Sequence, residues 1–401
     1  MVSPLTVSNE QTKATASKRS QALGVSGIRD IFEKAHKISN VVRLEFGEPD
    51  FDTPENIKQA AIRAITEGHT KYTSSAGIPE LRKAVSEKLE KDNKIHYEAS
   101  KEVVVTAGAT AALNLALQAT LDPHEEILVP DPGWATYVHS VQLVGATPVM
   151  YPLKESMGYR IVREDIERLI TRGTRAILIN SPSNPIGSIL SRSDVQAIAD
   201  LAMEHNLFVL SDEVYEKFVY PDPGTHREHV SIASLPGMKE RTVTFNSMSK
   251  TYSMTGWRIG YAASSAELSS AMIKANSAAS SCVSTIAQYA ALEALTGPQD
   301  SVRKMISVFK DRRDLLVRGL NKIGGFKCST PSGAFYAFPN ILETGLTSMN
   351  LAMKILEEAR VATVPGSAFG DEGEGHLRIA YANSTENIER ALERISKLMN
   401  S

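Results

Sequence analysis

The chain has 401 residues, a formal net charge of −2 at pH 7, 42% hydrophobic residues and 22% charged residues. This length exceeds what one small core organises, so we expect two or more lobes. The near-neutral charge offers no basic surface for nucleic acid or for a membrane face, and no apolar run approaches the roughly 18 residues that span a bilayer.

The N-terminal segment and the cysteines bear on location and metal binding. Residues 1–20 are polar and lack the apolar region of a secretion signal. Cys282 and Cys328 are too few for a disulfide or metal framework, so we expect a protein of the reducing cytoplasm. The nine histidines show no HxxxH or HExxH spacing, and we expect no metal site.

The first half of the chain alternates between short apolar runs and amphipathic stretches. The first 25 or so residues, rich in Ser, Thr, Lys and Gln, predict a flexible arm. The expected strands are residues 102–106, 126–130, 175–180, 207–211, 242–246 and 258–263, and helices are expected at 110–121 and 193–206. Such alternation predicts a largely parallel sheet with helices on both faces.

The second half of the chain has a different pattern. Residues 283–322 read as continuously helical, and one long helix there can bridge two lobes. The runs GAFYAF, ARVATV and HLRIAYA, separated by helical stretches, predict a smaller α/β lobe. We therefore expect an N-terminal arm with part of the small domain over 1–45, a large domain over 46–290 and a small domain over 291–401.

Small and polar residues follow several of the expected strands, where open α/β sheets bind ligands. Gly108 to Thr110 open a helix whose free N–H groups suit an anion, although a simple helix cap is the alternative interpretation. Asn184 follows a later strand in a turn, and Asp212 follows the next strand, with Tyr215 three residues on. Each feature alone is typical of an ordinary turn or cap.

The segment SMSKTYSMTGWR, residues 247–258, combines hydroxyl side chains, one lysine and one arginine. Hydroxyls with an arginine are good phosphate ligands, and Lys250 beside a phosphate site can act as a nucleophile. The segment also fits the SxxK signature of penicillin-recognising serine hydrolases, but the chain lacks usable SDN-type and KTG-type partners.

One ligand uses all of these strand ends, and that ligand is pyridoxal phosphate. Its phosphate needs N–H groups, hydroxyls and an arginine, while its aldehyde needs a lysine. Its pyridine nitrogen needs a carboxylate, which makes the ring an electron sink. The four strand ends therefore converge on this cofactor.

The chain resembles the class I aminotransferases of the fold-type I pyridoxal phosphate enzymes, from about Gly47 to the C-terminus. Eight segments match that family in order: LEFGEPDFDTP, YTSSAGIPELR, VTAGATAAL, NSPSNPIG, SDEVYEKF, SMSKTYSMTGWRIGY, PSGAFYAF and LRIAYANS. The segment SGIRDIFE, residues 26–33, resembles a branch common among prokaryotic and archaeal members. The resemblance implies a large cofactor-binding domain, with a mostly parallel sheet between helices, and a smaller α/β domain.

The resemblance also implies roles for individual residues around the cofactor. Lys250 would form the imine with the aldehyde and shuttle the proton, and Asp212 would pair with the pyridine nitrogen. Tyr215 and Asn184 would hydrogen-bond the phenolic oxygen, and Trp134 would stack on the ring. The residues implied for the phosphate are Gly108, Ala109, Thr110, Ser247, Ser249 and Arg258, together with Tyr72 of a neighbouring subunit.

Substrate binding and assembly follow from the same resemblance. Arg378 would hold the substrate α-carboxylate bidentately, with Gly47, Trp134 and Asn184 close to the substrate. Because Tyr72 would serve the neighbouring subunit, a homodimer with active sites at the subunit boundary is implied.

The implied reaction moves an amino group between an L-amino acid and a 2-oxo acid, often 2-oxoglutarate, in a ping-pong mechanism. Thr110 stands where some aspartate-using relatives have a lysine, and Ile186 stands where the family usually has threonine. We therefore expect a broad enzyme that prefers aromatic or other neutral donors. An aspartate enzyme, in which Arg29 substitutes for the lysine, and a pyridoxal phosphate lyase on the same scaffold are the alternatives. A ligand-sensing module of a transcription regulator would need a DNA-binding domain, and residues 1–45 are too few for one.

Overall fold

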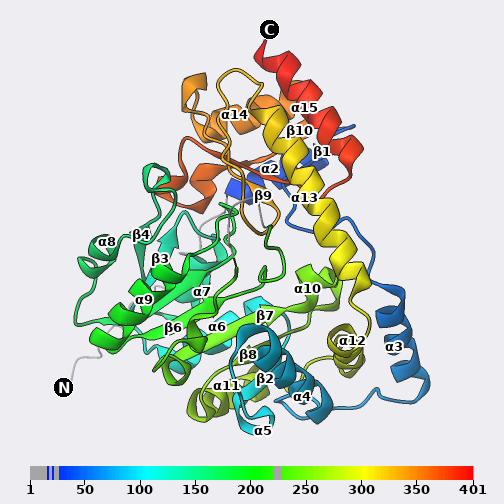
Figure 1. The fold of residues 1–401 in the computed structure, drawn as a ribbon, viewed down its shortest axis with the longest axis vertical. Coiled ribbons are helices and arrows are strands. Elements are labelled where there is room, and N and C mark those ends of the chain that lie inside the picture. The colour runs from blue at the N-terminus through cyan, green and yellow to red at the C-terminus, as the bar shows by residue number, and fades with distance from the viewer. Residues whose placement is uncertain (1–15, 18–19, 22–26, 221–227, 401) are drawn as a thin grey trace, which may run out of the picture.

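The computed structural model describes residues 16–17, 20–21, 27–220 and 228–400 (Figure 1). Most of the expected N-terminal arm lies outside these residues. Within the described ranges, no helix is long and apolar enough to cross a membrane.

A seven-stranded sheet forms the larger part of the molecule, in the order β2-β8-β7-β6-β5-β3-β4. Its strands are β2 (Val103–Thr106), β3 (Glu126–Asp131), β4 (Thr147–Pro152), β5 (Thr174–Asn180), β6 (Phe208–Asp212), β7 (Thr242–Ser247) and β8 (Gly260–Ala263). The six expected strands are present, and the expected α/β fold with a mostly parallel sheet is confirmed.

Helices cover both faces of this sheet (Figure 1). The helices of this larger lobe are α3 (Glu55–Thr66), α4 (Pro79–Lys88), α5 (Ala99–Glu102), α6 (Ala109–Thr120), α7 (Thr136–Val144), α8 (Arg163–Glu167), α9 (Arg192–Glu204), α10 (Met248–Thr251), α11 (Ala266–Ser280) and α12 (Thr285–Thr296). Successive residues of β5 alternate between two cores, because side chains of a strand point to opposite faces. Ile177 packs in the core that includes Val195 of α9, whereas Leu178 packs in the core that includes Leu113 of α6.

Strand β8 is the one reversed strand of this sheet, antiparallel to both β7 and β2. Its start therefore lies at the edge where the parallel strands end. Arg258, two residues before β8, has a left-handed backbone with φ +51°. The reversal thus returns this arginine to the carboxyl edge of the sheet.

Strand β4 was not expected from the sequence. It contains Pro148 and Pro152, which discourage a strand assignment because proline donates no ladder hydrogen bond. β4 pairs only with β3, at the edge of the sheet, where proline is tolerated.

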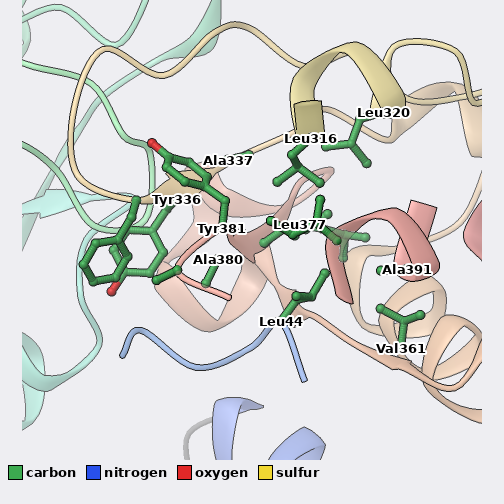
Figure 2. Packing of buried hydrophobic residues seen from close by; sticks show 14 of the residues in the cluster. Leu44, Leu316, Leu320, Tyr336, Ala337, Val361, Leu377, Ala380, Tyr381 and Ala391 are labelled. Carbon is green, nitrogen blue, oxygen red and sulfur yellow. The ribbon is translucent and has the colours of Figure 1, made fainter. Parts of the chain in front are cut away.

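A smaller sheet and its helices form the second lobe. Its strands are β9 (Tyr336–Ala337), β11 (Val364–Pro365) and β12 (Leu377–Ala380), and β1 (Val42–Arg43) pairs with β10 (Val361–Ala362). Its helices are α2 (Gly27–His36), α13 (Asp300–Leu320), α14 (Ser348–Lys354) and α15 (Thr385–Met399). Figure 2 shows its core, where Leu44, Leu316 and Leu377 come from distant parts of the chain.

The expectation of uninterrupted helix over 283–322 is wrong. The region contains α12 and α13, separated at Gly297 and Pro298. Proline lacks the N–H that would continue the ladder, and Gly297 closes α12 by donating to the Glu293 carbonyl. The bridging helix itself is present as α13, which runs from the large sheet toward the smaller lobe (Figure 1).

Candidate active site

A cavity of about 350 Å³ lies at the carboxyl edge of the large sheet and extends to β9 and β12 of the smaller lobe. The predicted site residues that line it are Gly47, Ala109, Thr110, Trp134, Asn184, Asp212, Tyr215, Ser247, Ser249, Lys250, Arg258 and Arg378. Parallel strands that end at one edge bring these distant residues together.

One end of the cavity is built to receive an anion. Gly108 precedes α6 with φ +85°, and a Cβ on it would come within 2.8 Å of Arg258 Nη2. The absent side chain therefore lets the guanidinium lie against the N-terminus of α6, where free N–H groups and the helix dipole add positive potential. The buried hydroxyls of Ser247 and Ser249, which lie 2.8 Å apart, border the same end.

A buried carboxylate, Asp212, lies at the end of β6. It accepts hydrogen bonds from Tyr137 Oη at 2.6 Å and from the Val214 N–H at 3.2 Å. Burial raises the pKa of Asp212 to about 6, against the lowering effect of these two donors. Asp212 is therefore mostly ionised at neutral pH and suits a cationic partner inside the cavity.

Lys250 follows β7 in the short helix α10 and donates from Nζ to the Gly47 carbonyl. Burial lowers the pKa of Lys250 to about 8, and the nearby Arg378 and Arg258 also lower it. A lysine with a depressed pKa has a larger neutral fraction, which nucleophilic attack and proton abstraction both require.

A second guanidinium, that of Arg378, lines the cavity from the smaller lobe. Arg378, on β12, donates from Nη1 to Asn184 Oδ1 at 3.0 Å and from Nη2 to the Glu45 carbonyl at 2.6 Å. Its guanidinium lies 4.7 Å from the Tyr336 ring centre and 4.9 Å from that of Phe369. Its Nε is buried without a hydrogen-bond partner among the described residues, so this fork retains capacity for a carboxylate.

Trp134 forms one wall of the cavity. It precedes α7, and its ring meets that of Tyr137 edge-to-face at 5.4 Å. A flat, half-buried aromatic side chain in this position can stack on a planar ligand.

Six residues that line the cavity were not predicted from the sequence: Glu45, Phe46, Tyr137, Val214, Thr255 and Tyr336. Tyr137 had a detectable signal, because it lies three residues after Trp134 in the same polar and aromatic run, DPGWATY. Tyr336 lies inside the quoted segment PSGAFYAF, but its partners, Tyr215 and Arg378, come from distant parts of the chain. Glu45 directly precedes Phe46 and Gly47, and its burial depends on tertiary packing.

Two predicted residues lie apart from the cavity or beyond description. Tyr72 is 89% exposed and does not line this chain's cavity, so its role toward a neighbouring subunit stays a prediction. Arg29 belongs to helix α2, but its side chain lies outside the described residues.

These residues fit pyridoxal phosphate. The anion site at α6, the lysine and the buried carboxylate supply one partner for each charged or reactive group of that cofactor. The Arg378 fork, with its unpartnered Nε, remains available for a substrate carboxylate.

Comparison with known proteins gives an independent result. Residues 39–395 match the model of the family "Aminotransferase class I and II". The chain is 43% identical to an aspartate aminotransferase of Pyrococcus abyssi and 41% identical to aromatic-amino-acid aminotransferase 2 of Thermococcus litoralis, each over 96% of this chain and 98% of the relative. The crystal structure of an aromatic aminotransferase from Pyrococcus horikoshii has a TM-score of 0.87 at 43% identity, covering 93% of this chain and 98% of the other. The chain belongs to the class I and II aminotransferases, which depend on pyridoxal phosphate.

Proposed function

We propose that this aminotransferase has broad donor specificity, prefers aromatic or other neutral L-amino acids, and uses 2-oxoglutarate as acceptor. The observation that carries the proposal is the shared cavity of Lys250, Asp212 and Arg378, which provides a base, an anion for the cofactor ring and a carboxylate clamp. An aspartate-preferring enzyme is the second candidate, because the Pyrococcus abyssi relative carries that name.

The residues divide the work as follows. Arg378 binds the substrate α-carboxylate and thereby orients the α-carbon toward Lys250. Bound pyridoxal phosphate supplies an electron-withdrawing ring that stabilises negative charge at that carbon. Asp212 keeps a proton on the ring nitrogen, while Tyr215 and the Asn184 side-chain amide donate to the phenolic oxygen. Ser247, Ser249, Arg258 and the N-terminus of α6 hold the phosphate.

Lys250 would hold the cofactor through its aldehyde and would act as the base when substrate is bound. Its depressed pKa favours the neutral amine, which would take the proton from the substrate α-carbon and return it in the second part of the transfer. Walls from both lobes enclose this step and limit the access of water.

Donor preference follows from the wall beside Gly47. Phe46 lines the cavity, is 39% exposed, and is supported edge-to-face by Phe32 at 5.3 Å and by the Arg43 guanidinium at 4.8 Å. Thr110 offers a hydroxyl in place of a lysine. With a hydroxyl at Thr110 and an exposed aromatic ring at Phe46, this wall favours neutral and aromatic side chains over a second carboxylate. Ile186 is buried and does not line this cavity, so it does not contribute directly.

A single-turnover screen of amino acids tests this preference by following the absorbance of the bound cofactor. We expect phenylalanine and tyrosine to react at least as efficiently as aspartate, and Phe46→Ala to lower their kcat/KM about tenfold while leaving alanine nearly unchanged. Aspartate ahead of phenylalanine by more than about a hundredfold, roughly 2.7 kcal/mol, would contradict the proposal and point to a distal-carboxylate site.

We further propose a homodimer in which Tyr72 reaches the phosphate site of the partner, since an 89% exposed tyrosine is available for such a contact. The division into residues 1–45, 46–290 and 291–401 and a cytoplasmic location belong to the same proposal. Its support is the separation of the seven-stranded sheet from the two smaller sheets, together with the two free cysteines.

A further inference from the structure

Tyr336 lies where the two lobes meet inside the cavity. It belongs to β9, is 1% exposed, and its hydroxyl is 2.7 Å from that of Tyr215, which follows β6 of the large sheet. β9 pairs with β12, where Ala380 is opposite Tyr336, and β12 also carries Arg378. One side chain thus connects the two sheets next to the reacting groups.

Two further contacts fix this side chain. The Arg378 guanidinium lies 4.7 Å from the centre of its ring, within the range of a cation–π interaction. A Cβ on Gly47 would lie 2.1 Å from its hydroxyl, so residue 47 must be glycine for the tyrosine to fit. The ring therefore supports Arg378, while the hydroxyl contacts Tyr215.

The hydroxyls of Tyr215 and Tyr336 have one hydrogen each, so each hydroxyl can donate only one hydrogen bond. Tyr215 has one O–H, which the proposed function directs to the phenolic oxygen of the cofactor. Tyr215 Oη must then accept the hydrogen bond of the pair, and Tyr336 must donate it. A donor hydroxyl that accepts a hydrogen bond becomes a stronger donor, because chains of hydrogen bonds polarise one another.

We propose that Tyr336 is a positioning residue that couples the substrate-carboxylate site to the cofactor: its hydroxyl strengthens the hydrogen bond donated by Tyr215, and its ring holds Arg378. The proposal rests on the proposed function. The roles of the hydroxyl and the ring can be tested separately, because Tyr336→Phe removes the hydroxyl and keeps the ring, whereas Tyr336→Leu removes both.

The first test is a pH titration of the visible absorbance of the holoenzyme. A weaker donor stabilises the negative phenolic oxygen less, which disfavours the deprotonated chromophore and raises its pKa. We expect Tyr336→Phe to raise the midpoint by about half a pH unit or more. The matched control is Tyr381→Phe, because Tyr381 is a buried tyrosine of the same core that donates to the Ala334 carbonyl (Figure 2). We expect this control to titrate like the wild type.

The second test measures binding of 3-phenylpropionate, a monocarboxylate without an amino group, to the holoenzyme. We expect Tyr336→Phe to keep the wild-type Kd and Tyr336→Leu to weaken binding about fivefold or more, because only leucine removes the ring beneath Arg378. An unchanged midpoint in Tyr336→Phe, or an unchanged Kd in Tyr336→Leu, would overturn the inference. A wild-type protein that binds no cofactor, or that transfers no amino group, would instead overturn the proposed function.

Discussion

Asp212 and Glu213 are neighbours in the chain at the end of β6, but their surroundings differ. Asp212 lines the active-site cavity, where Tyr137 and a backbone N–H are its donors. Glu213 belongs to a buried ionic cluster that we define as Lys88, Asn93, Glu213, Glu216 and His229. Both carboxylates are removed from water, so each needs compensation for the cost of burying a charge.

In the ionic cluster the protein supplies that compensation itself. Glu213 Oε1 accepts from Ser211 at 2.9 Å and from Ser231 at 2.7 Å, and its Oε2 lies 2.9 Å from His229 Nε2. Glu216 accepts from Lys88, and Asn93 donates to both carboxylates, at 3.0 Å to Glu213 and 2.8 Å to Glu216. With cations and amides already on these oxygens, the group has the character of a structural element rather than of a metal site.

In the cavity the compensation is incomplete. Burial raises the pKa of Asp212 to about 6 and lowers the pKa of Lys250 to about 8, and Arg378 Nε has no partner among the described residues. We propose that a cofactor and a substrate complete these groups. We infer from this difference that Asp212, in the cavity, serves catalysis, whereas Glu213, in the ionic cluster, stabilises the fold.

The largest expected effect is on the reaction rate when Asp212 is replaced. Asp212→Asn should slow the first half-reaction about a thousandfold with little change in substrate Kd, because only the transition state needs the ring charge that Asp212 stabilises. Rapid-mixing absorbance measurements with saturating donor check this. A wild-type rate in this variant would remove Asp212 from the mechanism.

The next effect concerns unfolding rather than rate. The side chains of Lys88 and Glu216 are 11% and 6% exposed, so Lys88→Met leaves a buried carboxylate without its cation. We expect a loss of about 3 kcal/mol in the free energy of unfolding of the apoenzyme. Denaturant titration checks this, with Lys83→Met as control, because Lys83 forms an exposed pair with Glu87 and should change stability by less than about 0.5 kcal/mol. If Lys88→Met lost no more stability than the control, the ion pair of Lys88 with Glu216 would not stabilise the fold.

The smallest effect is the pH dependence of stability from the same cluster. Burial lowers the pKa of His229, but the carboxylates of Glu213 and Glu216 outweigh it, so the net pKa is raised above the usual 6.5. The stabilisation by protonated His229 is then complete below about pH 6.5 and is lost as pH rises through the raised value. Thermal unfolding of wild type and His229→Gln from pH 6 to 9 should show a Tm difference of a few degrees that shrinks with rising pH. A difference that grows with pH would show that His229 is buried neutral.

The sequence predicted the large sheet and most of the site because the same pattern encodes both. Apolar runs mark the parallel strands, and the polar residues after each run meet at one edge, as Asp212 and Lys250 do. The edge strand β4 was not predicted because its two prolines are unusual in a strand. The break at Pro298 was not predicted because the residues on both sides of it have a helical pattern. Tyr336 was not predicted because its partners are more than 40 residues away in sequence. The pairing of β9 with β12 brings Arg378 to it, and the packing of the two lobes brings Tyr215.

We propose that a cofactor attached to Lys250 occupies the cavity at the strand ends. Borohydride reduction of the holoenzyme, followed by proteolysis and mass spectrometry of the peptides, tests it most directly. We expect one pyridoxyl adduct, on the peptide that contains Lys250. We expect no adduct in Lys250→Ala, whose apoenzyme should keep the wild-type circular dichroism spectrum. An adduct on a different lysine of the wild-type protein would contradict the account.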